Sequence, residues 1–161
     1  DYAFTPEQSI SHGITTFVAQ NRGAGRKERI RKGFRRGLML EACYWVFISI
    51  TITLFRRPLM GLFVTAGNEG IVALGSSYLG LMALFYVFPA FTNGIQGFFR
   101  GMGNMSVTLL GTFVQTSLRV VFVYLLTSGI GLLGVAYACA IGWSVMLLVE
   151  VPYYFWFMKD K

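Results

Sequence analysis

The sequence predicts an all-α membrane protein, a bundle of about five transmembrane helices of roughly 20 apolar residues each. Of its 161 residues 55% are hydrophobic and only 13% are charged, with a mean hydropathy of +0.58. Soluble domains carry about 25% charged residues, so this chain lacks the polar residues needed to cover a water-exposed surface. Long apolar runs recur along the chain, and in a bilayer such runs satisfy their backbone hydrogen bonds as helices.

The first expected span, 3–20, is truncated and polar near its start. The residues near its start that make it polar or interrupt the apolar run are Pro6, Glu7, Gln8, Ser9, Ser11 and His12. Such residues do not suit contact with lipid, so this helix should face a cavity or neighbouring helices. It leads into 22–36, where eight basic residues accompany a single acid, Glu28. We expect 22–36 to be a basic loop.

The second and third spans follow at 38–55 and 71–99, joined by a connection that begins at Arg56, Arg57 and Pro58. The third is long and contains Pro89, which has no backbone N–H and is therefore expected to kink the helix. It ends in a glycine-containing turn at 100–104.

The fourth span, 105–126, and the fifth, 132–158, are separated by an expected tight turn at 127–131. Small residues early in the fifth span recur at spacings of three and four, which predicts close helix packing. These residues are Gly131, Gly134, Ala138 and Gly142. The two cysteines, Cys43 and Cys139, fall nearer opposite faces of the membrane, so no disulfide is expected between them.

The distribution of Lys and Arg predicts the orientation. Eleven of these residues lie in 22–36, at Arg100 and in the tail with Lys159 and Lys161, whereas the other side has only Arg56 and Arg57. Positively charged connections remain in the cytoplasm. We therefore expect a multi-pass plasma-membrane protein with 22–36 and the carboxy terminus cytoplasmic.

Two charged residues are expected deep in the membrane. At about 1.5 Å per residue, Glu7 lies about 20 Å and Arg119 about 21 Å from the cytoplasmic face. An unpaired arginine there costs roughly 2.5–3.5 kcal/mol on insertion scales. We hypothesise that Glu7 and Arg119 interact, directly or through water; the alternative is that Arg119 extends outward alone.

Arg119 is also part of a polar stripe on the fourth span, because Thr108, Thr112, Gln115 and Arg119 share one helix face. This stripe predicts a cavity lining, with Glu7, Gln8 and His12 as further cation or substrate candidates. Interhelical hydrogen bonding is the alternative explanation, and it is the one we favour for Asn93 and Gln96.

Three other charged residues are interpreted as structural ion-pair partners. Glu41 is expected about 6 Å and Glu150 about 10 Å inside the cytoplasmic face, counted along the helices. Arg100 falls near that depth, as do Arg35 and Arg36. A role in ion coupling is the alternative for the two acids.

Several other chemistries are not favoured. Gly23, Ala24 and Gly25 follow no strand and precede no Gly-Lys-Ser/Thr, so a phosphate-binding loop is not expected. His12 is the only histidine and lacks ligands at metal spacing, and no catalytic set typical of a hydrolase is present. The basic segment between two spans suits anionic lipid better than nucleic acid. No cofactor, metal or nucleic-acid partner is therefore expected.

An ordered set of motifs resembles the multidrug and toxic compound extrusion (MATE) family. The strongest is Gln20-Asn21-x-Gly23-Ala24-Gly25 with the basic run after it. The other matching residues are Gly13, Ile14, Phe17, Val18, Ala19, Arg29, Ile30, Gly33, Pro58, Leu59, Leu62, Phe63, Gly75, Tyr78, Leu79, Arg100, Gly101, Gly103, Arg119, Gly131, Gly134, Val135, Ala138 and Trp143. They cover nearly the whole chain in the family's order.

This resemblance implies that 1–161 is the carboxy-terminal lobe of a two-lobe (6+6) transporter, lacking its first helix. Such proteins export small cationic or amphiphilic compounds by alternating access, driven by Na⁺ or H⁺. The expected partners are membrane lipid, the substrate and the missing amino-terminal lobe. In some branches an acid on helix ten joins the cation site, but the third span has no acid between 71 and 99. Glu7 is then the best titratable candidate.

Other functions stay open on the sequence. A flippase of lipid-linked saccharides from the same superfamily is the nearest alternative, although such proteins show more cationic lumens than the single deep Arg119 provides. A non-transporting membrane scaffold would lack polar residues aligned at depth, unlike the stripe from Thr108 to Arg119. A membrane enzyme is the least favoured, for want of a catalytic set.

Overall fold

The structure is a computed structural model that describes residues 4–64 and 68–159, all of it helices and short connections. Its helices are α1 (Thr5–Gly23), α2 (Lys27–Gly61), α3 (Glu69–Phe85), α4 (Val87–Gly101), α5 (Met105–Ile130) and α6 (Leu132–Lys159). By length and composition α2, α5 and α6 can each cross a membrane, and α3 with α4 can form a fourth, bent span. The all-helical membrane fold is thus confirmed. Ala3, 65–67 and Lys161, which entered the expectations above, lie outside the described residues.

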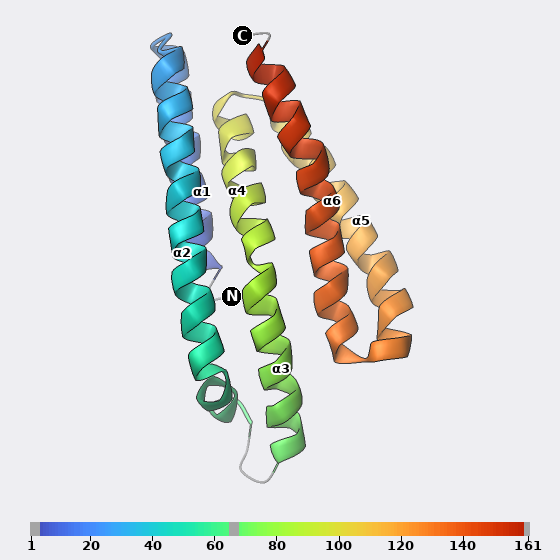
Figure 1. Ribbon diagram of the computed structural model, residues 1–161. Coiled ribbons are helices and arrows are strands. Elements are labelled where there is room, and N and C mark those ends of the chain that lie inside the picture. The colour runs from blue at the N-terminus through green and yellow to red at the C-terminus, as the bar shows by residue number, and fades with distance from the viewer. Residues whose placement is uncertain (1–3, 65–67, 160–161) are drawn as a thin grey trace.

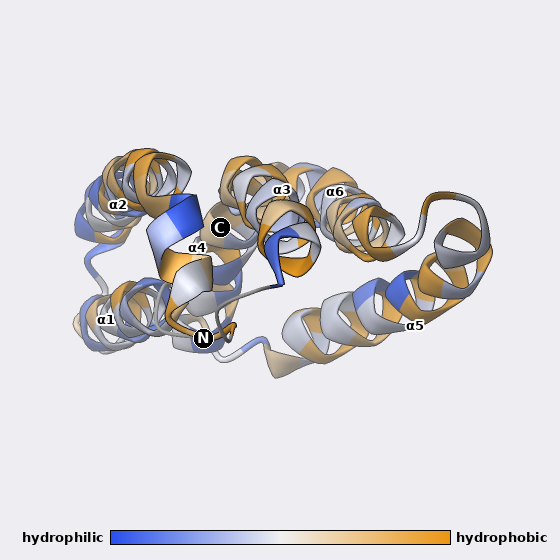
Figure 2. Cartoon of the chain, turned by 90° about the horizontal axis from the view of Figure 1, so that it is seen from below, coloured by the Kyte–Doolittle hydropathy of each residue, from blue (hydrophilic) through white to orange (hydrophobic). Residues whose placement is uncertain are grey.

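With α3 and α4 taken as one bent span, successive spans run in opposite directions, so the connections gather at two ends (Figure 1). The α1–α2 and α4–α5 connections and the end of α6 lie at one end, and the α2–α3 and α5–α6 connections lie at the other. The basic segment, Arg100 and Lys159 therefore share an end of the bundle, as the charge count predicts. Many large hydrophobic side chains are exposed, among them Leu109, Phe113 and Leu125 of α5, and Figure 2 shows hydrophobic residues along that helix. That surface suits lipid.

Several connections are shorter than the sequence predicts. The expected loop at 22–36 is wrong, because only 24–26 join α1 to α2 and the rest is helical. Arginine, lysine and glutamate are good helix formers, so charge alone did not end the helix. The chain instead reverses direction between α1 and α2 at Gly25, whose φ is +68°, a conformation that glycine adopts without strain.

The ends of α2 and α5 also extend beyond their expected limits. α2 continues through Arg56, Arg57 and Pro58 to Gly61, so the connection predicted to begin at Arg56 is wrong. Similarly, α5 continues to Ile130 and the turn before α6 is essentially Gly131, with φ +60°. An apolar run therefore underestimates a helix whose polar ends project from the hydrocarbon.

The predicted kink of the third span is confirmed. α3 ends at Phe85, α4 begins at Val87, and their axes differ by 41°. Pro89 is the third residue of α4 and has no N–H to donate to the carbonyl of Phe85. The break thus falls one turn before the proline, where the missing hydrogen bond would have been.

Glycines on α4 allow α1 to approach very closely. A Cβ at Gly97 would lie 2.6 Å from the carbonyl oxygen of Ser11, and one at Gly101 would lie 2.7 Å from that of Thr15. Real Cβ atoms do not approach so closely, so the two backbones meet where side chains are absent. This contact fixes the position of the polar helix α1 against the centre of the bundle.

The α5–α6 hairpin uses small residues in the same way. A Cβ at Gly134 would lie 2.8 Å from the backbone of Leu126, and one at Gly142 would lie 3.0 Å from the carbonyl of Gln115. Ala138 is fully buried. Close packing is therefore confirmed at these three residues, whereas Gly131 serves the turn instead.

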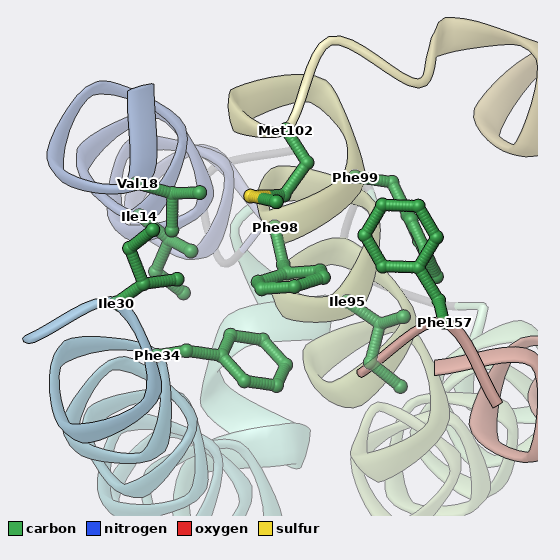
Figure 3. Close-up of a cluster of buried hydrophobic side chains, with 9 residues drawn as sticks. All are labelled: Ile14, Val18, Ile30, Phe34, Ile95, Phe98, Phe99, Met102 and Phe157. Carbon is green, nitrogen blue, oxygen red and sulfur yellow. The ribbon is translucent and has the colours of Figure 1, made fainter. Parts of the chain in front are cut away.

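An aromatic core joins α2, α4 and α6 near the basic end (Figure 3). The ring of Phe98, fully buried, lies 4.8 Å from that of Phe34 and 5.0 Å from that of Tyr154, centroid to centroid. Phe99 and Phe157 extend the cluster with edge-on contacts. Burying these rings ties three helices together at this end.

Candidate functional site

Two carboxylic side chains, Glu7 of α1 and Glu41 of α2, lie together inside the bundle. They are 4% and 0% exposed, and their carboxyl groups interact electrostatically. Glu7 is about 24 Å along α1 from Gly23 and Glu41 about 21 Å along α2 from Lys27, at 1.5 Å per residue. Because the two helices are antiparallel and joined at that end, the acids lie at the same level. The expected difference in depth between Glu7, at about 20 Å, and Glu41, at about 6 Å, is thus wrong, because α2 begins eleven residues before the predicted span.

Glu41 has no compensating partner among the described residues. Both of its carboxyl oxygens are buried without a hydrogen bond, and no described basic side chain pairs with it. An ionised carboxylate in such a place is costly unless a cation or proton neutralises it. The expectation of a structural ion pair at Glu41 is therefore wrong.

The helix face that carries Glu7 also carries Ser11, one turn away, and packs against α4. The Ser11 hydroxyl donates to the carbonyl oxygen of Asn93 at 2.5 Å, and Nη2 of Arg100 donates to the Ser11 Oγ at 2.7 Å. Arg100 thus bonds to a hydroxyl in place of the acid expected for it, and its Nε has no partner. Gln8 and His12 lie on another face of α1 and are exposed.

The structure does not bring Glu7 and Arg119 together. Arg119 instead interacts with the Cys139 thiol of α6 and the Tyr78 hydroxyl of α3. The expectation of a direct Glu7–Arg119 pair is therefore wrong, while an interaction through water stays a prediction. Cys43 and Cys139 are both free cysteines, in agreement with the expected absence of a disulfide between them.

The polar stripe of α5 divides between two neighbours rather than lining one surface. Nε2 of Gln96 lies 3.5 Å from Thr112 Oγ1, on the α4 side. Gln115 is buried against Gly142 of α6, and the buried Oγ1 of Thr108 has no hydrogen-bond partner. Much of the stripe thus contributes to helix packing.

The contact that the sequence did not predict joins Gln96 to Glu150. Nε2 of Gln96 donates to Oε1 of Glu150 at 3.2 Å, and Glu150 is 1% exposed. Its other oxygen, Oε2, is buried without a partner, so the ion pair expected at Glu150 is also wrong. Packing of Gln96 was anticipated; its acceptor was not, because nothing in the sequence brings α4 beside α6.

The residues that the structure describes include no group of three or more His, Cys, Asp or Glu side chains placed to hold a metal ion. The notable feature of the described residues is therefore a set of buried carboxyl groups for which no basic partner is seen, and two of them, Glu41 and Glu150, lie in helices that can cross a membrane. Buried ionisable residues of this kind are typical of membrane proteins that move ions or solutes. Fold and site together define the class of multi-pass membrane transport proteins.

Comparisons with known proteins identify the family. The MatE family model matches residues 1–125. A Thermotoga maritima protein named "Probable multidrug resistance protein NorM" is 32% identical over 135 residues, which are 82% of this chain and 29% of that protein. A Bacillus subtilis protein of the same name is 27% identical over 107 residues, 66% of this chain and 23% of that one. The chain belongs to the MatE family, whose members are membrane transporters and not enzymes.

Solved structures agree with this fold. An inward-facing multidrug resistance MATE family transporter of the MOP superfamily superposes with a TM-score of 0.85 at 24% identity, covering 94% of this chain and 34% of that one. A MATE protein in the bent conformation gives 0.84 at 22% identity, covering 99% and 37%. The matched part of this chain thus spans between about a quarter and just over a third of the length of these relatives.

Proposed function

We propose that this chain is the carboxy-terminal lobe, helices eight to twelve, of a secondary active exporter of cationic or amphiphilic compounds. It works with an amino-terminal lobe, by alternating access driven by Na⁺ or H⁺. The observation that carries the proposal is the buried carboxyl pair of Glu7 and Glu41 at one level inside the bundle. The names of the two relatives support multidrug compounds as substrates.

Glu7 is the residue proposed to bind the coupling ion. It lies in α1, the helix too polar to count among the candidate spans, and Glu41 is its acidic neighbour. Two buried carboxyl groups that repel each other disfavour simultaneous ionisation, and a bound monovalent cation or a proton relieves that repulsion. Thr108, Thr112, Gln115 and Arg119 remain proposed cavity residues on α5, with Gln8 and His12 on the exposed face of α1.

The basic end of the bundle is proposed to be cytoplasmic, in the plasma membrane. Eleven of the chain's basic residues belong to this end by sequence, and anionic lipid there suits 22–36. Single cysteines introduced at Lys32 and at Ser128, both exposed, test this in intact cells. A membrane-impermeant maleimide should label Ser128→Cys and leave Lys32→Cys unlabelled until the cells are opened. The reverse pattern would overturn the orientation.

Transport itself is tested with the full-length protein in proteoliposomes. Ethidium, a lipophilic cation, should move against its own gradient when an opposing Na⁺ or H⁺ gradient is imposed. Imposing each gradient separately identifies the coupling ion. If neither gradient drives ethidium or another organic cation, the exporter proposal fails, and movement of a lipid-linked saccharide in the same vesicles would favour the flippase.

A further inference from the structure

A second feature of the molecule lies apart from the carboxyl pair: a groove between α2 and α6 at the basic end of the bundle. Its volume is about 700 Å³, within the roughly 300–1,000 Å³ of typical ligand pockets. α4 lies between the two helices and keeps their backbones apart (Figure 1). The two helices thus meet only through side chains, and these form the groove.

Basic side chains line the outer part of the groove. Arg31 and Arg35 come from α2 and Lys159 from α6, and all three are exposed. The two guanidinium groups are positively charged at any physiological pH. No described acidic residue lines the groove, and Glu28, the single acid of 22–36, is not part of it. The groove therefore attracts anions.

Apolar side chains line the part of the groove farther from the basic end. Leu38 lies about 10 Å along α2 beyond Arg31, at 1.5 Å per residue. Phe155, 67% exposed, lies one turn of α6 farther from that end than Lys159. Both residues line the groove, so each helix presents first a cation and then an apolar side chain to it. An amphiphile whose anionic group lies at the membrane surface has the same order of parts.

The floor of the groove is well packed. Phe34 is 3% exposed, and its ring lies 4.9 Å from that of Tyr154, centroid to centroid. Both rings also contact the buried Phe98 of α4. Arg31 of α2 interacts electrostatically with the Tyr154 hydroxyl of α6. A ligand thus meets a preformed surface, and less conformational freedom is lost when it binds.

We propose that this groove binds one anionic phospholipid, with its phosphate among Arg31, Arg35 and Lys159 and its acyl chains along Leu38 and Phe155. An arginine can donate two parallel hydrogen bonds to phosphate oxygens, and basic pockets between membrane helices bind lipid headgroups. A free anion would leave the apolar wall unused, and a neutral lipid would leave the charges unused.

Such a site differs from the general attraction of 22–36 for anionic lipid. A charged surface attracts many lipids that exchange freely, whereas the groove combines charges and apolar walls from two helices in one place. A single lipid is therefore expected to bind the purified protein more tightly than the rest. The inference does not depend on whether the protein exports anything.

Native mass spectrometry of the delipidated full-length protein in detergent tests the proposal. One copy of dioleoylphosphatidylglycerol should bind with a Kd about tenfold or more below that of dioleoylphosphatidylcholine, which has the same chains but no net charge. Tenfold is a free-energy difference of about 1.4 kcal/mol. Equal affinity for the two lipids would overturn the proposal. Glycerol phosphate, which has no acyl chains, would overturn the lipid as occupant if it bound equally tightly.

A matched pair of double variants locates the site. Arg31→Gln/Arg35→Gln should weaken binding of dioleoylphosphatidylglycerol about tenfold or more. The control, Arg29→Gln/Arg36→Gln, removes the same charge from exposed positions of the same helix, which line a different hollow beside Phe17. This control should leave the affinity unchanged. Equal weakening by both double variants, or weakening by neither, would show that no defined lipid site exists in the groove.

A second pair of variants tests the apolar wall. Phe155→Ala should weaken binding of the same lipid, because it removes a side chain that the acyl chains contact. The matched control is Trp156→Ala, since Trp156 is 58% exposed on the same helix but does not line the groove. Wild-type affinity in Phe155→Ala would overturn the proposed position of the acyl chains.

The outcome is separable from that of the exporter proposal. Lipid binding is measured without an ion gradient, and none of the groove residues is proposed to bind the coupling ion. Gradient-driven efflux by a protein with no preference for dioleoylphosphatidylglycerol removes the lipid site and leaves the exporter. Lipid binding that depends on Arg31 and Arg35, in a protein without gradient-driven efflux, does the opposite.

Discussion

Replacing Gly97 with leucine is expected to abolish folding of the full-length transporter in the membrane. The Cβ alone would lie 2.6 Å from the Ser11 carbonyl oxygen and 2.9 Å from the Ser11 Oγ. These atoms belong to a helix backbone and to a hydroxyl already bonded to Asn93, so neither can move easily. Overpacking a well-fitted core costs about 1–3 kcal/mol, and separating two helix backbones should exceed that range.

Thermal unfolding in detergent, followed by size-exclusion chromatography, measures this effect. Gly97→Leu should give aggregated protein or a strongly lowered melting temperature. The matched control is Gly13→Leu on α1, because nothing lies within 4 Å of a Cβ at Gly13. If Gly97→Leu is as stable as Gly13→Leu, α1 does not pack against α4 as described, and the burial of Glu7 loses its structural basis.

The helices were predictable because their physical cause is local. Each apolar run is long enough to cross the hydrocarbon, and inside it a chain has no alternative to helical hydrogen bonding. The break between α3 and α4 was likewise predictable from Pro89, because the missing N–H is a property of that single residue. The closely packed glycines of α5 and α6 were predictable from their spacing alone.

Helix ends were less predictable. Hydropathy identifies the residues that lie in the hydrocarbon, but a helix can continue beyond them into polar residues. The residues from Lys27 to Arg36 are as helical as the apolar residues that follow them. Nothing in their charge forbids this, since lysine and arginine favour helices. The predicted span began eleven residues after the true start of α2. Glu41 was therefore placed about 16 Å too close to the start of its helix, at the rise of an α-helix, and its proximity to Glu7 was not recognised.

The site was predicted only in part, because pairing depends on how helices meet. Glu7 and Arg119 were expected at similar depth in the membrane. The depth of a residue does not say toward which neighbouring helix its side chain points, and Arg119 interacts with Cys139 and Tyr78. Glu150 and Gln96 are 54 residues apart and meet only because α4 packs beside α6. The sequence does supply one useful signal: Glu41 and Glu150 each interrupt an otherwise apolar run, which makes a buried role worth testing.

The proposed coupling of efflux to an ion gradient depends most directly on the carboxyl group of Glu7. In Glu7→Gln the side chain keeps its shape but can no longer bind a cation by charge or exchange a proton. We expect ion-driven efflux by the full-length protein to fall about fivefold or more, the lower end of coupling free energies of about 1–3 kcal/mol. The matched control is Glu69→Gln, because Glu69 is an exposed acid at the start of α3.

The most direct measurement is therefore the initial rate of gradient-driven ethidium efflux in proteoliposomes holding equal amounts of wild type, Glu7→Gln and Glu69→Gln. We expect Glu69→Gln to match the wild type, and Glu7→Gln to lose the dependence on the ion gradient while remaining folded. Efflux by Glu7→Gln at the wild-type rate, with the same response to the gradient, would contradict this expectation.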